Sequence, residues 1–297
     1  MHSHDHSGVR DRRLLWIALA LILGLMAVEV VAGILANSLA LLADAGHMLT
    51  DAAALAAAIV AAGLAARPPR GAWTFGLGRA EILAAQANGI TLLLVGIWIV
   101  YGAIRRLVDP PDVHGGTVLV VALAGVVVNL AATLVLSRAD RESLNVRGAF
   151  LHVATDLAAF VGTAIAGALI LLTGWNRFDP VAALLVAGLM FASAWTLLRE
   201  SGRIFMEASP AGIDPAHVAR TLADDPDVVS VHDLHVWTVT SGFPALAAHV
   251  LVSPDADCHA ARRRLQHVLE ERYHLHHVTL QVDHVARRSQ PVELQHR

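Results

Sequence analysis

Six long apolar runs constrain this chain more than any other feature of its sequence. They cover residues 14–36, 39–64, 80–104, 117–137, 149–173 and 180–199, and each reaches the ~20 residues that a helix needs to cross a bilayer. Apolar residues make up 56% of the 297 residues and charged residues only 16%, against about 25% charged in a typical soluble domain. The first run exceeds the ~7–15-residue core of a signal peptide, so we interpret it as a span. The sequence predicts a membrane all-α bundle of six helices.

Arginine placement indicates how this bundle is oriented. Membrane proteins carry an excess of positive charge in their cytoplasmic loops, and all 22 basic residues of this chain are Arg. Eleven flank the side that holds both termini and three flank the other; the eleven are Arg10, Arg12, Arg13, Arg67, Arg70, Arg79, Arg138, Arg141, Arg147, Arg199 and Arg203, and the three are Arg105, Arg106 and Arg177. We therefore expect a multi-pass protein of the cell (inner) membrane with both termini in the cytoplasm. A net charge of −3 and the lack of a basic, aromatic-interleaved stretch argue against nucleic-acid binding.

From about residue 208 the composition becomes that of a soluble domain. The expected elements are a helix with Asp214 as N-cap and Pro215 at its first position, strands 228–239 and 244–252, a helix from Asp255 or Asp257 to about Tyr273, and a strand 277–284. This αββαβ order predicts a small α+β domain with one sheet and helices on one face. The expected domains are a His-rich tail (1–13), a six-span domain (14–207), a cytoplasmic α+β domain (208–285) and a disordered tail (286–297).

Two histidines of the 17 lie inside the spans, and each has an aspartate four residues later. The pairs are His47 with Asp51 and His152 with Asp156. Residues i and i+4 share one face of a helix, so each pair offers an imidazole nitrogen and a carboxylate to the same point. Two such helices side by side would supply two nitrogen and two oxygen ligands, a set that suits tetrahedral Zn²⁺.

The simpler interpretation is that each pair only satisfies itself, as an internal salt bridge. A carboxylate near the bilayer centre costs about 2.5–3.5 kcal/mol even on the lenient insertion scale, and this chain bears that cost twice with the same spacing. The flanking residues are largely Ala and Gly, which let helices approach closely in a membrane. A metal site is therefore favoured. Asp44, three residues before His47, is a candidate partner of the metal ligands or a carboxylate on the entry path. For Glu29 in the first span, cavity lining and packing against another helix both stay open.

Four motifs together resemble the cation diffusion facilitator family: ADAGHMLTD in the second span, FGLGRAEILAA entering the third, HVATD in the fifth and VHDLHVWT in the tail. The resemblance covers nearly the whole chain. It implies a homodimer in the bilayer, a four-ligand transport site at positions 47, 51, 152 and 156, and exchange of cytoplasmic metal for protons. It also implies a cytoplasmic domain like a metallochaperone, of the ferredoxin type. A His–Asp/His–Asp set is similar to the zinc-preferring branch, so zinc is the expected substrate, with cadmium, cobalt or iron as alternatives.

The same resemblance implies a second, regulatory zinc site in the tail, at His232, His249 and Asp283. His259 and Cys258 are further candidate ligands, although Gln281 stands where one branch has a bridging histidine. A polar cluster without metal is the alternative. Because strand residues alternate, His232 and His235 are expected on opposite faces of the sheet. Cys258 is the single cysteine, which excludes a Cys-pair zinc motif.

Two other functions are weighed against transport. An intramembrane metalloenzyme would need three protein ligands, an open water position and a general base; four ligands close the site and the chain has no HExxH run, so we expect no enzyme. A membrane metal sensor that does not transport is the second alternative. Some members of the family bind metal in the connection between the second and third spans, but this connection has neither Asp nor His before Glu81. Arg79 there is a candidate partner for Glu207.

Overall fold

The computed structural model describes the backbone of residues 23–136 and 144–285, and within these the side chains outside 131–154. The His-rich tract (1–13) and the predicted disordered tail (286–297) lie outside the described residues. Contacts divide the chain into two units: Met1–Ala57 with Ala87–Leu198, and Ala58–Gln86 with Arg199–Arg297. The connection between the second and third spans thus groups with the C-terminal part of the chain.

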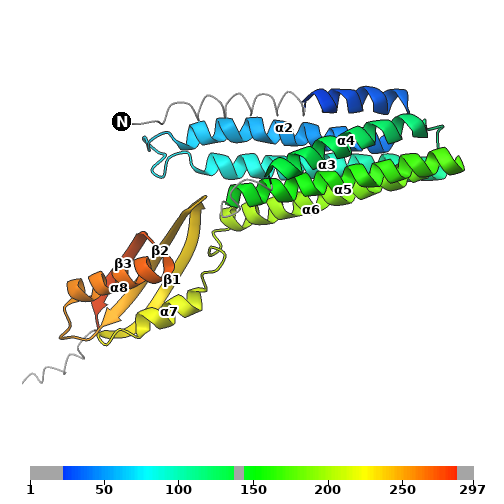
Figure 1. Ribbon diagram of the computed structural model, residues 1–297. Helices are drawn as coiled ribbons and strands as arrows, with labels where there is room; N and C mark the ends of the chain where they lie inside the picture. The colour runs from blue at the N-terminus through cyan, green and yellow to red at the C-terminus, as the bar shows by residue number, and fades with distance from the viewer. Residues whose placement is uncertain (1–22, 137–143, 286–297) are drawn as a thin grey trace, which may run out of the picture. The chain divides into compact units, whose positions relative to one another are not determined.

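The first unit is a bundle of long, roughly antiparallel helices (Figure 1). A first helix, described over Leu23–Leu35, precedes α2 (Leu39–Ala65), α3 (Arg79–Val108), α4 (Gly115–Leu136), α5 (Leu144–Thr173) and α6 (Phe178–Phe205). Within the described ranges α2, α3, α5 and α6 are long and apolar enough to cross a membrane, and the described parts of the other two are shorter apolar helices. A helix is present at each of the six predicted spans.

Small residues set the packing inside the bundle. Alanines from α2, α3, α5 and α6 fill the core around Leu92, Ile99 and Met190. A Cβ on Gly125 of α4 would lie 2.1 Å from the ring of Phe160 in α5, and one on Gly167 of α5 would lie 2.7 Å from the backbone N of Leu119. Only glycine permits these contacts, so α4 and α5 approach as closely as small residues allow.

The outer surface of the bundle is apolar. Large side chains are exposed along every described helix, among them Leu35, Ile59, Trp98, Val120, Leu172 and Trp195. A soluble protein rarely exposes so much contiguous apolar surface, whereas lipid tails solvate it without cost. The helical unit is therefore that of a multi-pass membrane protein.

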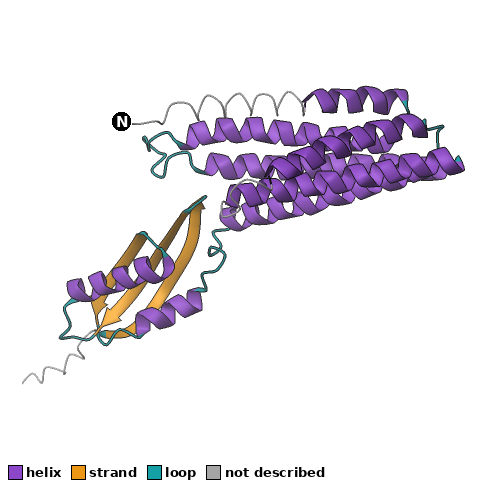
Figure 2. Ribbon diagram, viewed as in Figure 1, coloured by secondary structure: helices purple, strands orange, loops and turns teal. Residues whose placement is uncertain are grey.

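In the C-terminal part, α7 (Pro215–Ala223), β1 (Val228–Thr240), β2 (Phe243–Val252), α8 (Cys258–Tyr273) and β3 (His277–His284) follow the predicted order. β1 pairs antiparallel with β2, which pairs parallel with β3, and both helices cover one face of the sheet (Figure 2). The core between them contains Leu222, Leu246, Val250, Leu265 and Leu269. The prediction of a three-stranded α+β domain is confirmed.

Local signals placed the helix starts correctly. Asp214 is the N-cap of α7 and accepts a hydrogen bond from the Ala216 N–H at 3.0 Å, with Pro215 at the first position. Asp257 caps α8 by accepting from the N–H groups of His259 and Ala260 at 2.9 and 3.1 Å. The hydrogen bonds from Ala260 and His259 hold the pKa of the Asp257 carboxyl below its ordinary value.

The sheet corrects one prediction. His232 pairs with His249 whereas His235 pairs with Ala247, so three steps on β1 match two on β2. Asp233 has φ 52°, which marks the extra residue of a β-bulge. His232 and His235 therefore lie on the same face, the one opposite the helices, and the expectation of opposite faces was wrong because simple alternation assumes an unbroken strand.

Candidate metal site between α2 and α5

The structure brings together three of the four predicted ligands. The Nε2 atom of His47 lies 3.7 Å from Oδ2 of Asp51, one turn later on α2, and 3.5 Å from Oδ1 of Asp156 on α5. His152 belongs to α5, one turn before Asp156, but its side chain lies outside the described residues. Among the described side chains, no group of three potential ligands converges closely enough to form a metal site. The described side chains do not include His152, the predicted fourth ligand of the site at His47.

The two distances from His47 are close to the spacing of ligand atoms around a small divalent cation. Ligand atoms around a tetrahedral zinc ion stand ~3.3–3.6 Å apart, given metal–ligand distances of about 2.0–2.2 Å. Nε2 of His47 is at 3.5–3.7 Å from both carboxylates. Two carboxylates and a neutral imidazole carry two negative charges at membrane depth, which a divalent cation would neutralise. The site thus has the chemistry of a cation site.

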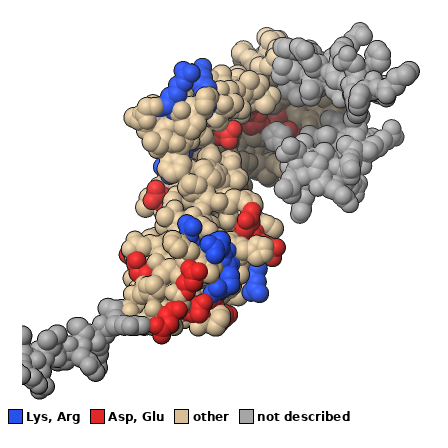
Figure 3. All heavy atoms as spheres, turned by 90° about the vertical axis from the view of Figure 1, so that its left-hand side faces the viewer, with Lys and Arg blue, Asp and Glu red and all other residues tan. Residues whose placement is uncertain are grey.

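Access to the site differs between the two ends of the bundle. The side chains of Asp51 and Asp156 are 28% and 20% exposed, whereas that of His47 is 6% exposed. Residues of α2 on the other side of His47 are almost all buried, including Leu39, Ala40 and Ala43. Seen from the end that carries the α2–α3 connection, acidic side chains lie in a hollow among the helices (Figure 3). Among the described residues, the site is exposed toward that end and buried at the other.

Asp179 closes the other end, and the sequence did not single it out. Its carboxylate is 0% exposed and accepts hydrogen bonds from the Ser38 hydroxyl and from the N–H groups of Leu39 (2.7 Å) and Ala40 (3.3 Å). Oδ2 also lies 3.6 Å from Nη1 of Arg106 on α3. A side chain of α6 thus caps α2 at its first turn. The only sequence signal was an acidic residue at the border of the sixth apolar run.

The tail histidines lie on the open face of the sheet. The rings of His232 and His249 are 5.3 Å apart at 90°, and His249 pairs with Gln281 across β2 and β3. The Gln281 amide donates to Oδ2 of Asp283 at 2.8 Å, so this carboxylate lies on the same face as the two histidines. The three predicted residues thus share one face of the sheet, but the described side chains do not converge closely enough to form a metal site there.

The two extra candidates, Cys258 and His259, are the first residues of α8, one of the two helices that cover the other face of the sheet (Figure 2). Sγ of Cys258 lies 3.3 Å from Nε2 of His284, and His284 alternates with Asp283 along β3, so it points to the helix-covered face. His259 donates a hydrogen bond from its backbone N–H to the Asp257 carboxylate. The structure places Cys258 on the opposite face of the sheet from His232 and His249.

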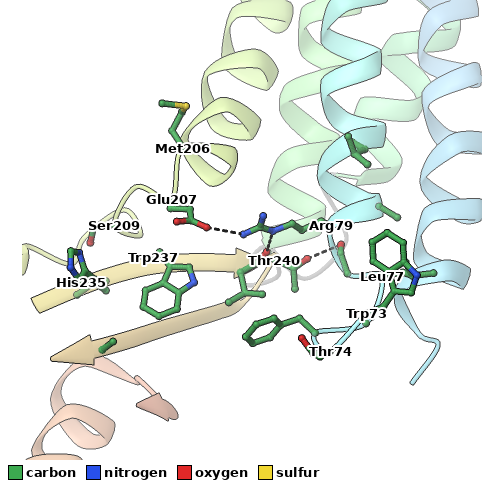
Figure 4. A pocket seen from close by; sticks show the side chains of 18 of the residues that line it. Trp73, Thr74, Leu77, Arg79, Met206, Glu207, Ser209, His235, Trp237 and Thr240 are labelled. Carbon is green, nitrogen blue, oxygen red and sulfur yellow. Dashed lines mark hydrogen bonds and ion pairs between the residues drawn. The ribbon is translucent and has the colours of Figure 1, made fainter. Parts of the chain in front are cut away.

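Arg79 pairs with Glu207 as predicted, with Nη2 and Oε1 3.5 Å apart (Figure 4). The Arg79 Nε–H also donates to the carbonyl of Val239 at 3.1 Å, and the Thr240 hydroxyl donates to the carbonyl of Gly78 at 2.8 Å. These residues line a cleft of about 1170 Å³ between the α2–α3 connection and β1. Both charged side chains are largely exposed, so the ion pair adds little stability by itself.

Comparison with protein families identifies the architecture. A model of the cation efflux transmembrane domain matches residues 15–206, and a model of the cation efflux protein cytoplasmic domain matches residues 210–285. The chain belongs to the cation diffusion facilitator family. The family that the four sequence motifs indicated is thereby confirmed.

Its relatives cover almost its full length. It is similar to the zinc transporter ZitB of Escherichia coli K12, with 42% identity over 291 residues (95% of this chain, 92% of the relative). It is 41% identical over 287 residues to the metal cation efflux system protein CzcD of Cupriavidus metallidurans (95% and 89%). It is 39% identical over 285 residues to the cadmium, cobalt and zinc/H(+)-K(+) antiporter of Bacillus subtilis (94% and 91%). A metal-bound C-terminal domain of a CzcD transporter shares 32% identity, covering 24% of this chain and 97% of that domain, with a TM-score of 0.23.

Proposed function

We propose that this cation diffusion facilitator is a secondary active transporter that exports zinc from the cytoplasm in exchange for protons. The observation that carries the proposal is the convergence of His47, Asp51 and Asp156 at membrane depth. The names of the relatives, which include zinc transporters and a cadmium, cobalt and zinc antiporter, support zinc and leave cadmium and cobalt as alternative substrates. No enzyme activity is proposed.

Exchange follows from competition for the same atoms. An imidazole nitrogen binds metal only when it carries no proton, and the ordinary pKa of histidine, about 6.5, lies in the physiological range. Zinc would displace protons from His47 and its carboxylate neighbours as it binds, and protons would return when it leaves. His152, one turn before Asp156, is the proposed fourth ligand. Opening of one end of the site at a time would then couple the two fluxes.

The proposed direction rests on arginine placement and on access to the site. The arginine-rich side of the membrane would be cytoplasmic, and it is the side of the α2–α3 connection, toward which the site opens. Asp179 would hold the other end closed. The structure therefore corresponds, under this proposal, to a cytoplasm-open conformation of a cell-membrane protein with cytoplasmic termini.

The cytoplasmic α+β domain (208–285) would regulate transport as part of a homodimer. His232, His249 and Asp283 would bind a zinc ion on the open face of the sheet, and His235, which the bulge turns to the same face, adds another nitrogen. A match to the family's cytoplasmic domain supports dimerisation. A molar mass twice that of the chain in detergent, after subtraction of the micelle, is the expected result of light scattering.

Zinc uptake by proteoliposomes tests the main proposal. A pH gradient should drive zinc flux in the wild type, and Asp51→Ala and Asp156→Asn should abolish it. The matched control is Asp109→Asn, an exposed carboxylate just after the C-terminal end of α3, which should transport normally. Undiminished zinc flux in Asp51→Ala would contradict the assignment of Asp51 to the transport site. Zinc binding without flux in the wild type would favour the non-transporting sensor.

A further inference from the structure

Two carboxyl groups inside the bundle have no assigned role. Glu29, on the first helix, is 0% exposed and Asp44, on α2, is 2% exposed. No hydrogen-bond donor among the described residues reaches either oxygen of the Glu29 carboxyl or Oδ2 of Asp44. The two carboxyl groups lie within hydrogen-bonding reach of each other. Two carboxyl groups that lie close together without a donor need a proton or a cation between them.

The occupant that fits best is a proton. Two ionised carboxylates buried without donors would each bear a desolvation cost of several kcal/mol and would also repel one another. One proton removes one charge and turns one carboxyl into a hydroxyl donor for the other, which satisfies an oxygen on each side. A metal cation is a poorer fit, because hard cations take about six or more oxygen ligands and only three partnerless oxygens meet at this point.

The pair is placed to sense the metal site. Asp44 lies one turn before His47 on α2, and the charge of Asp156 on α5 acts on both Glu29 and Asp44. His47 and Asp51 are the other titratable groups that act on Asp44. The negative charge of Asp156 favours a proton on the pair. A divalent cation bound by Asp156 would reverse that field, and the proton would then be released.

We propose that Glu29 and Asp44 form a second proton site, separate from the metal ligands, which loses its proton when the metal binds and regains it when the metal leaves. This inference rests on the proposed transport function and deepens it. Glu29 is the group that exchanges the proton, and it belongs to a different helix from the predicted ligands. Metal export would then be coupled to protons at two places in the bundle.

The test counts protons released when zinc binds to the purified full-length protein in detergent. A His249→Ala background removes the proposed tail site, so that binding reports on the membrane site. Glu29→Gln and Asp44→Asn imitate the protonated carboxyls in shape and cannot release a proton. Thr163→Val is the matched control, because Thr163 is also a buried polar residue whose hydroxyl has no partner among the described residues.

Glu29→Gln and Asp44→Asn should each release up to one proton fewer per zinc than the wild type and Thr163→Val. Zinc affinity should then rise less steeply with pH in these variants: for each pH unit, the rise should be smaller than in the wild type by a factor of up to about ten. An unchanged proton count in both variants, with normal zinc binding, would overturn the second site and leave the transport proposal intact. If zinc binding depended on potassium, and only Glu29→Gln and Asp44→Asn lost this dependence, the occupant of the pair would be a monovalent cation. That result would also overturn the second proton site. Zinc binding that survives Asp51→Ala would instead contradict the proposed function.

Discussion

The Asp179 carboxylate is the best place to test how the bundle holds its proposed metal ligands. In Asp179→Ala, the N–H groups of Leu39 and Ala40 and the hydroxyl of Ser38 lose their common acceptor, and Arg106 loses its nearest carboxylate. Ser38 and Asp179 are both 0% exposed, so water cannot replace the lost acceptor without rearrangement. The first turn of α2 would be left uncapped inside the protein.

The magnitude follows from the groups left unpaired. A buried donor without an acceptor costs about 1–3 kcal/mol, and removing one partner of a buried ion pair costs about 3–5 kcal/mol. These costs overlap, because one shift of α2 relieves several of them together, so we expect about 3–5 kcal/mol in total. For a unit of ~200 residues this corresponds to a fall in Tm of about 6–20 °C. Asp179→Asn keeps one acceptor oxygen and should lose about half as much.

Thermal unfolding in detergent, followed by tryptophan fluorescence, measures the loss, and hydrogen exchange locates it. Exchange should accelerate in the first turns of α2, and zinc binding should weaken because His47 lies only about 12 Å further along the same helix. Asp109→Asn, an exposed carboxylate just after α3, should change neither. A Tm for Asp179→Ala within about 1 °C of the wild type, with unchanged protection at Leu39 and Ala40, would refute the capping role.

Two further predictions concern packing and charge outside the metal site. Gly167→Ala should destabilise the bundle by about 1–3 kcal/mol, because its Cβ would meet the backbone of α4; Gly188→Ala, which has nothing within 4 Å, is the control in the same unfolding assay, and equal stabilities would contradict the close approach. Arg264 donates hydrogen bonds to Asp225 and Asp227, and its hydrogen bonds lower the pKa of the Asp225 carboxyl. The contact therefore stabilises the cytoplasmic α+β domain at pH values above the ordinary carboxyl pKa. This stabilisation is lost as the pH falls through the lowered pKa of Asp225. Hydrogen exchange in α8 should therefore quicken in Arg264→Ala at neutral pH, and the difference from wild type should disappear in acid; Arg262→Ala, an exposed neighbour, should resemble the wild type throughout.

Local patterns in the sequence determined the elements of this protein and the identity of its transport motif. Apolar runs predicted the helices of the bundle, Asp214–Pro215 predicted the start of α7, and the two His–Asp spacings marked α2 and α5. Such signals are reliable because helix length, capping and i,i+4 geometry depend on residues within a few positions of one another.

Only the tertiary structure decided which of these residues meet, and on which side. The bulge at Asp233 turned His235 to the face of His232, although no local signal predicted it. The carboxylate of Asp179 meets the first turn of α2, and that of Glu29 meets Asp44 one turn later, only because α6 and the first helix pack against α2. The distances from His47 to Asp156, and the exposure of the site at one end, likewise arise from helices far apart in sequence. Contacts of this kind depend on how the packed helices share one interior, which no short window of the sequence records.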